Sequence, residues 1–177
     1  MRVSIVLRSL ATGGAERQFV AMAVGLRDLG HDVQILTLYP DNAFEADLEA
    51  GQVPHHALVR DPTGPSAALR RMSAPAWLAR RFRRQGADVV YATSPGVSFL
   101  SWSVAESLRL PLAWGVRGYS PSFSEAWLVS HRRCRHVSAR VAGLVANSHD
   151  LMAKYRAMGF QNPIQRVVPN GVDLTRF

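Results

Sequence analysis

Two adjacent glycines, Gly13 and Gly14, lie between an apolar run and a helical stretch near the start of the chain. The run at residues 3–7 is typical of a strand buried on both faces, and residues 15–29 are predicted as a helix. A parallel strand that leads through a glycine turn into a helix leaves free backbone N–H groups, which can hold an anion. Glu16 is also placed for a capping box. The segment predicts a site for a phosphate-bearing ligand, with a tight turn and helix cap as the alternative.

The elements that would position this site alternate along the chain. Strands are expected at 3–7, 32–38, 54–59, 87–92, 111–116, 142–146 and 165–168. Helices are expected at 15–29, within 39–51, at 66–85 with a new start at Pro75, and at 96–108, 124–141 and 149–158. This alternation predicts the α/β class, with one Rossmann-like, doubly wound parallel sheet in a single domain spanning 1–177.

Ligands of such sheets gather at the carboxyl ends of the strands, which nominates residues 10–14, 93–96, 117–120 and 147–148. Arg117 offers a fork of donors suited to a phosphate, with a structural ion pair to Glu125 as the alternative. Asn147 and Ser148 would contact a ligand, or else cap the helix that follows them.

Glycine spacing excludes three other classes of site. A dinucleotide fingerprint needs G-x-G-x-x-G and an acidic residue after the second strand, where residues 36–39 read Leu-Thr-Leu-Tyr. A P-loop needs a lysine beside its glycines, but the chain's one lysine is Lys154. The nucleophile elbow G-x-S-x-G is not matched at residues 96–100.

Composition indicates a globular protein, with 47% hydrophobic and 19% charged residues in 177. No apolar run is long enough for a membrane span, and the single cysteine, Cys134, excludes an internal disulfide. The net charge of +8 comes mainly from arginines, in two clusters at 70–84 and 132–140. No zinc-finger, RNP or helix-turn-helix pattern accompanies them, so we expect no nucleic-acid partner. An anionic membrane surface, a phosphorylated substrate and plain solvated helix faces remain open. For residues 75–84, the membrane reading competes with packing of Leu78 and Phe82 on the sheet.

Five segments together resemble the N-terminal domain of retaining GT-B glycosyltransferases of the family 4 type. They are GGAER at residues 13–17, DVVYATS at 88–94, LAWGVRG at 112–118, LVANS at 144–148 and VPNGVDLTRF at 168–177. The resemblance covers the whole chain in the family's order. The chain departs from it where Tyr91, Thr93 and Arg117 stand, because many relatives have a histidine at one of these positions.

The resemblance implies where ligands bind. Gly13 and Gly14 would bind the donor diphosphate. The acceptor side of the cleft would be lined by Glu16, Arg17, Ser94, Arg117, Asn147, Ser148 and Asn170, with no catalytic residue assigned. The co-substrate would be a nucleotide sugar and the acceptor a glycan or lipid-linked molecule, with neither metal nor other cofactor expected.

The resemblance also implies a missing partner. Residues 165–177 would begin the crossing to a donor-binding domain, which in the family carries an E-x7-E motif. The chain is thus expected to be the acceptor-side half of a retaining glycosyltransferase, inactive without a donor-binding domain that would be supplied in trans. The alternatives are a non-catalytic phosphate- or glycan-binding module and a truncated remnant. The expected setting is bacterial polysaccharide biosynthesis in the cytoplasm, including peripheral contact with the inner face of the membrane.

Overall fold

The computed structural model describes residues 1–59, 72–119 and 122–171. Its sheet has seven parallel strands in the order β3-β2-β1-β4-β5-β6-β7. The strands are β1 (Arg2–Leu7), β2 (Asp32–Thr37), β3 (His55–Ala57), β4 (Val89–Thr93), β5 (Leu112–Val116), β6 (Gly143–Ala146) and β7 (Ile164–Val167). The expectation of one doubly wound α/β sheet is confirmed. The order reverses between β1 and β4, where such sheets bind ligands.

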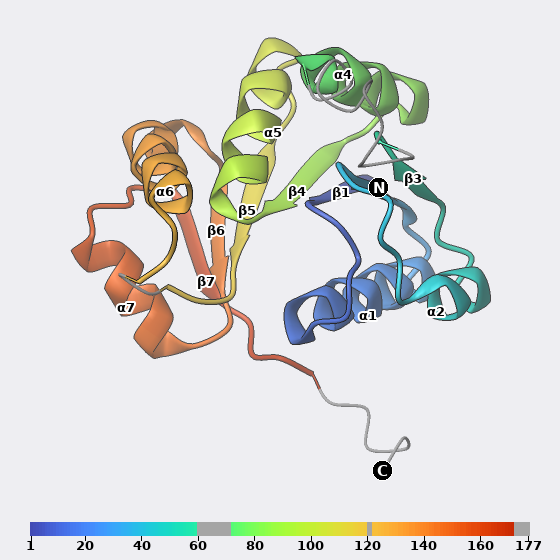
Figure 1. Ribbon diagram of the computed structural model, residues 1–177, viewed down its shortest axis with the longest axis horizontal. Coiled ribbons are helices and arrows are strands. Elements are labelled where there is room, and N and C mark those ends of the chain that lie inside the picture. Colours follow the sequence, from blue (N-terminus) through green and yellow to red (C-terminus); the bar gives the residue numbers. More distant parts are fainter. Residues whose placement is uncertain (60–71, 120–121, 172–177) are drawn as a thin grey trace.

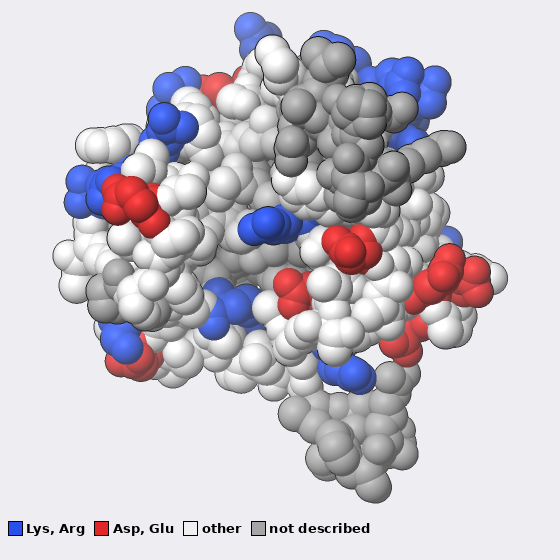
Figure 2. All heavy atoms as spheres, in the orientation of Figure 1, with Lys and Arg blue, Asp and Glu red and all other residues white. Residues whose placement is uncertain are grey.

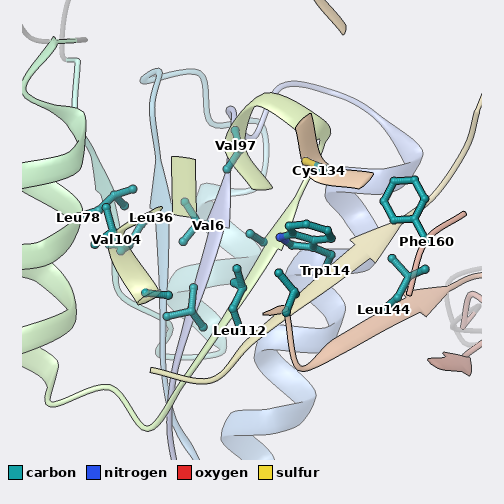
Figure 3. Close-up of a cluster of buried hydrophobic side chains, with 14 of the residues drawn as sticks. Val6, Leu36, Leu78, Val97, Val104, Leu112, Trp114, Cys134, Leu144 and Phe160 are labelled. Carbon is teal, nitrogen blue, oxygen red and sulfur yellow. The ribbon is translucent and has the colours of Figure 1, made fainter. Parts of the chain in front are cut away.

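Helices cover both faces of the sheet (Figure 1). The helices are α1 (Gly14–Asp28), α2 (Glu45–Ala50), α4 (Ala74–Gln85), α5 (Pro95–Ser107), α6 (Glu125–Val137) and α7 (His149–Ala157). Phe19 of α1 and Leu48 of α2 join one buried cluster, and residues of α4, α5, α6 and α7 join another on the opposite face. Figure 3 shows Trp114 of β5 within this second cluster, near Cys134 and Phe160.

Helix α4 tests the packing interpretation of residues 75–84. Leu78 and Phe82 are buried against the sheet, and Pro75 lies in the first turn, as its fixed φ angle favours. The packing interpretation is therefore confirmed, and Arg80, Arg83 and Arg84 remain on the exposed face. The helical prediction for residues 66–71 lies outside the described residues.

Other element boundaries shift by a few residues. The strand predicted at 54–59 is shorter, at His55–Ala57, and α6 ends at Val137 rather than at residue 141. A short 3-10 helix, Ser138–Arg140, follows α6 directly. The serine hydroxyl of Ser138 accepts a hydrogen bond from the Gln161 amide, which ties this turn to the segment after α7.

Asp88, the first residue of the DVVY segment, fastens the start of β1. Its carboxylate accepts hydrogen bonds from the Arg2 backbone N–H (2.8 Å) and the Arg2 guanidinium (2.7 Å). These bonds lower the pKa of Asp88 from 3.8 to about 2. Asp88, in the DVVYATS segment, thus stabilises the sheet at the amino ends of β1 and β4.

A pH dependence follows from this contact. Because the folded-state pKa is depressed, the stabilisation is complete above 3.8 and is lost as the pH falls toward about 2. We expect the urea midpoint of the wild type to fall more steeply through this window than that of Asp88→Asn. Parallel curves for the two proteins would show that the contact contributes nothing.

Candidate functional site

A cavity of about 400 Å³ opens at the carboxyl ends of β1, β4 and β5. The face shown in Figure 2 is hollowed near its middle, with basic and acidic side chains at the edge of the hollow. The cavity is lined at its rim by Arg8, Ser9, Glu16, Ser94, Arg117 and Gly118. It lies at the point where the strand order reverses, the place that the sequence argument nominated.

The glycine pair lies at the N-terminus of α1, and its two members differ. The carboxylate of Glu16 occupies the space where a Cβ of residue 13 would be, whereas a Cβ on Gly14 would meet nothing within 4 Å. Gly13 therefore lets the Glu16 carboxylate lie against the backbone, and a side chain at this position would displace that carboxylate. Gly14 leaves open space in which a ligand can approach the backbone. Neither glycine is among the cavity-lining residues, although Ala15 and Glu16 are.

Arg117 follows β5 and contacts the segment after β7. Its guanidinium donates to the Asn170 side-chain oxygen (2.9 Å) and lies over the ring of Phe19, 5.0 Å from its centre. Its Nε is buried and has no partner among the described residues. Glu125 pairs with Arg132 instead (2.7 Å), so the described residues do not bear out the expected alternative of an Arg117–Glu125 ion pair.

The segment that leaves β7 is held at the same rim. The Gln18 side chain donates to the Gly171 carbonyl (2.8 Å) and accepts from the Gly171 amide (3.0 Å). With the Arg117–Asn170 bond, these contacts fasten the first residues of the expected interdomain crossing to α1 and to the end of β5. The later part of the crossing, 172–177, lies outside the described residues.

Ser94 lies at the junction of β4 and α5 and lines the cavity. Its φ of 65° falls in the left-handed region, which is costly for a residue with a side chain. Strain of this kind persists where the surrounding structure imposes it, and it gathers at ligand-binding positions. The strained residue thus lies directly before α5, at the cavity.

Besides Asn170, three predicted acceptor-side residues are not among those that line the cavity: Arg17, Asn147 and Ser148. Arg17 places its guanidinium over the Phe44 ring, 5.6 Å from its centre. The Ser148 hydroxyl accepts from the Leu151 amide, which confirms the helix-cap reading of that residue, and Asn147 directly precedes it. The ligand-binding roles assigned to these three residues stay predictions.

The deep wall of the cavity is aromatic, and this wall was not predicted from the sequence. Phe123, Trp127 and His131 recur every fourth residue, a spacing that places them along one side of the chain as it enters α6. Trp114, Tyr155 and Phe160 complete this wall. Burial lowers the pKa of His131 to about 4, so its imidazole is neutral at pH 7. The four-residue spacing was the available signal, but the same spacing is typical of any packed helix.

Tyr91 is one of the three positions, with Thr93 and Arg117, at which the resemblance leads us to expect a histidine in many relatives. Its ring packs over Gly115, and burial raises the pKa of its hydroxyl. It also lies 5.9 Å from Phe19, between ring centres. Tyr91 thus packs against Phe19 and Gly115 and is not among the cavity-lining residues.

Comparisons with known proteins agree with this geometry. The sequence profile of the family described as Glycosyltransferase Family 4 matches residues 12–176. No curated protein matches the chain by sequence. The structure resembles HepE from Anabaena, solved with UDP, at a TM-score of 0.77 and 22% identity, over 99% of this chain and 45% of HepE.

Two other solved structures are similar at lower identity. Sucrose-phosphate synthase from Thermosynechococcus elongatus has a TM-score of 0.74 and 12% identity, over 100% of this chain and 50% of the enzyme. MurG from Acinetobacter baumannii has a TM-score of 0.64 and 14% identity, over 98% of this chain and 47% of MurG. The chain therefore spans about half the length of these proteins. In its described part, no helix has the length and apolar character needed to cross a membrane.

Proposed function

Because the chain belongs to glycosyltransferase family 4, we propose that it forms the acceptor-side half of a retaining glycosyltransferase. This half takes part in moving a sugar from a nucleotide-sugar donor to a glycan or lipid-linked acceptor. The observation that carries the proposal is the cavity at the reversal of strand order, with Arg117 and Glu16 at its rim. HepE, a structural neighbour, was solved with UDP and with UDP-glucose, which supports a nucleotide sugar as donor.

Each rim group has a role in this proposal. The open side of Gly14 and the N-terminus of α1 face the donor diphosphate, and Arg117 balances part of its negative charge. Glu16 is an acceptor of hydrogen bonds and would bind a hydroxyl of the sugar acceptor. The second wall of the cleft comes from a donor-binding half, because a departing diphosphate must be stabilised in a closed site that excludes water.

The glycine pair gives a test of the donor side. We expect the 177-residue chain to bind inorganic pyrophosphate, and we expect Gly14→Ala to weaken this binding about tenfold, the worth of one hydrogen bond to a charged group. The new methyl group would enter open space, so the free energy of unfolding should not fall. Calorimetric titration and urea unfolding of both proteins measure the two quantities.

Gly13→Ala is the matched variant. Its methyl group would displace the Glu16 carboxylate, which moves a negative charge without filling the open side of Gly14. Pyrophosphate affinity should therefore stay the same or rise. Equal losses in both variants, or binding that is unchanged in both, would count against a diphosphate at Gly14.

A further inference from the structure

Six residues form the deep wall of the cavity, here called the aromatic chamber. They come from β5, from α6 and the residues before it, and from α7 and the residues after it, and they are Trp114, Phe123, Trp127, His131, Tyr155 and Phe160. The imidazole of His131 stacks on Trp127, with an interplanar angle of 14° and 5.0 Å between ring centres. Its ring centre also lies 5.3 Å from that of Tyr155 and 5.0 Å from that of Phe160. The chamber is therefore largely apolar, with Phe123 exposed at 39%, and it joins a polar rim.

His131 supplies the unpaired polar atom of this chamber. Its side chain is among the buried residues, at 6% exposure, and its Nε2 has no hydrogen-bond partner in the described part of the chain. Leaving a buried polar atom unpaired is unfavourable, so this atom favours a ligand that can pair with it. Two other polar groups near this wall are engaged, since the Trp114 indole donates to the Ser98 carbonyl and the Cys134 thiol donates to the Pro95 carbonyl.

This arrangement of one unpaired polar atom in an aromatic wall determines which chemical groups the chamber can bind. A sugar ring carries several hydroxyls, and against a wall that is mostly aromatic carbon most of them would lose their hydration without gaining a partner. An apolar group with a single hydroxyl or carbonyl loses much less, because the one polar atom can pair with His131. A cavity of about 400 Å³ lies within the size range of small-molecule sites.

We propose that the aromatic chamber binds an apolar part of the acceptor, which carries one hydrogen-bonding atom at His131, while the polar end of the acceptor lies at the Arg117 rim. This inference rests on the proposed function and names its acceptor class as amphipathic. An apolar ring and an aliphatic chain would present the same chemistry to the chamber. The test distinguishes the two sources.

The experiment titrates the 177-residue chain with 2-naphthol, 1-octanol and methyl β-glucoside, followed by the NMR signals of the four tryptophan indole N–H groups. We expect one of the two apolar alcohols to shift the signals of Trp114 and Trp127 and to leave those of Trp77 and Trp102 in place. A response to 2-naphthol alone identifies a ring, and one to 1-octanol alone identifies a chain. A response of these signals to the glucoside alone, or to none of the three, would overturn the proposal.

Two tryptophans on neighbouring helices provide matched variants. Trp127→Ala should weaken binding of the alcohol at least about tenfold, since a large aromatic contact is removed. Trp102→Ala removes a half-buried ring that packs on Phe99 outside the cavity, and should leave the affinity within about twofold. Equal effects of the two substitutions would show a general loss of structure rather than a binding site.

His131→Phe tests the hydrogen bond separately. It keeps an apolar ring in the chamber but should remove the preference for 2-naphthol over 2-methylnaphthalene, or for 1-octanol over octane. An unchanged preference would refute the role of His131. Binding of the alcohol needs no donor, so alcohol binding without sugar transfer would contradict only the proposed function. Sugar transfer that is unchanged in Trp127→Ala would contradict only the proposal that the aromatic chamber binds the acceptor.

Discussion

Replacing Gly115 with alanine is expected to lower the free energy of unfolding by about 1–3 kcal/mol, the usual cost of overfilling a packed interior. Gly115 lies in the middle of the sheet, on β5 beside β4. A Cβ there would come 2.8 Å from Cε1 and Cζ of the Tyr91 ring. This ring is half-buried and packs against Phe19, which limits its movement. Either the ring must leave this packing, or the backbone of β5, which positions Arg117 two residues later, must shift.

Gly143→Ala on β6 is the matched control for this prediction. Its new methyl group would meet the Ala113 Cβ at 3.3 Å, a contact that a small shift can relieve. Urea unfolding should therefore show a clearly smaller loss than for Gly115→Ala. Similar losses for the two variants would mean that strand propensity, not the Tyr91 ring, sets the requirement for glycine.

The second large effect is expected for Arg117→Gln. A charge-assisted hydrogen bond contributes about 1.5–3 kcal/mol, so the affinity for pyrophosphate should fall roughly 10- to 100-fold. Arg132→Gln removes an equal charge from the exposed pair with Glu125 and should change the affinity by less than about twofold. Calorimetric titration of both variants compares a local role with a general effect of net charge.

Arg117 also holds the segment after β7, and Asn170→Ala separates the two roles. This substitution removes the 2.9 Å hydrogen bond but keeps the guanidinium at the rim. Pyrophosphate affinity should then stay within about twofold of the wild type, or rise as the fork is freed. A loss equal to that of Arg117→Gln would show that the fastened segment, rather than the cation, determines binding.

The sequence predicted the sheet and its ligand-binding edge because both follow from local patterns. Apolar runs alternate with helical stretches, and parallel strands bring their carboxyl ends together. Arg117, Ser94 and Glu16 were placed correctly at that edge because each follows a strand or begins a helix. Whether they bind a ligand stays a prediction.

What the sequence did not predict depends on packing between distant segments. Trp127 and His131 become one wall only when Tyr155 and Phe160 fold back against them, and helical spacing alone does not distinguish a cavity from a filled core. The Glu16 carboxylate lies in the space where a Cβ of residue 13 would be, and this depends on the conformation of the Glu16 side chain. The contact between Asp88 and Arg2 joins residues that are far apart in the chain.

The central claim is that this fold is the acceptor-side half of a sugar-transferring site. The most direct measurement is transfer of radiolabelled sugar from UDP-glucose and other nucleotide sugars to an amphipathic alcohol, by the 177-residue chain alone and with a donor-binding half. That half is the rest of its polypeptide or the product of a neighbouring reading frame with a second Rossmann-like pattern and E-x7-E. We predict that the chain alone transfers no sugar and that the chain with the donor-binding half does. We also predict that Arg117→Gln abolishes this transfer. Transfer by the chain alone, or none when the donor-binding half is present, would contradict the account.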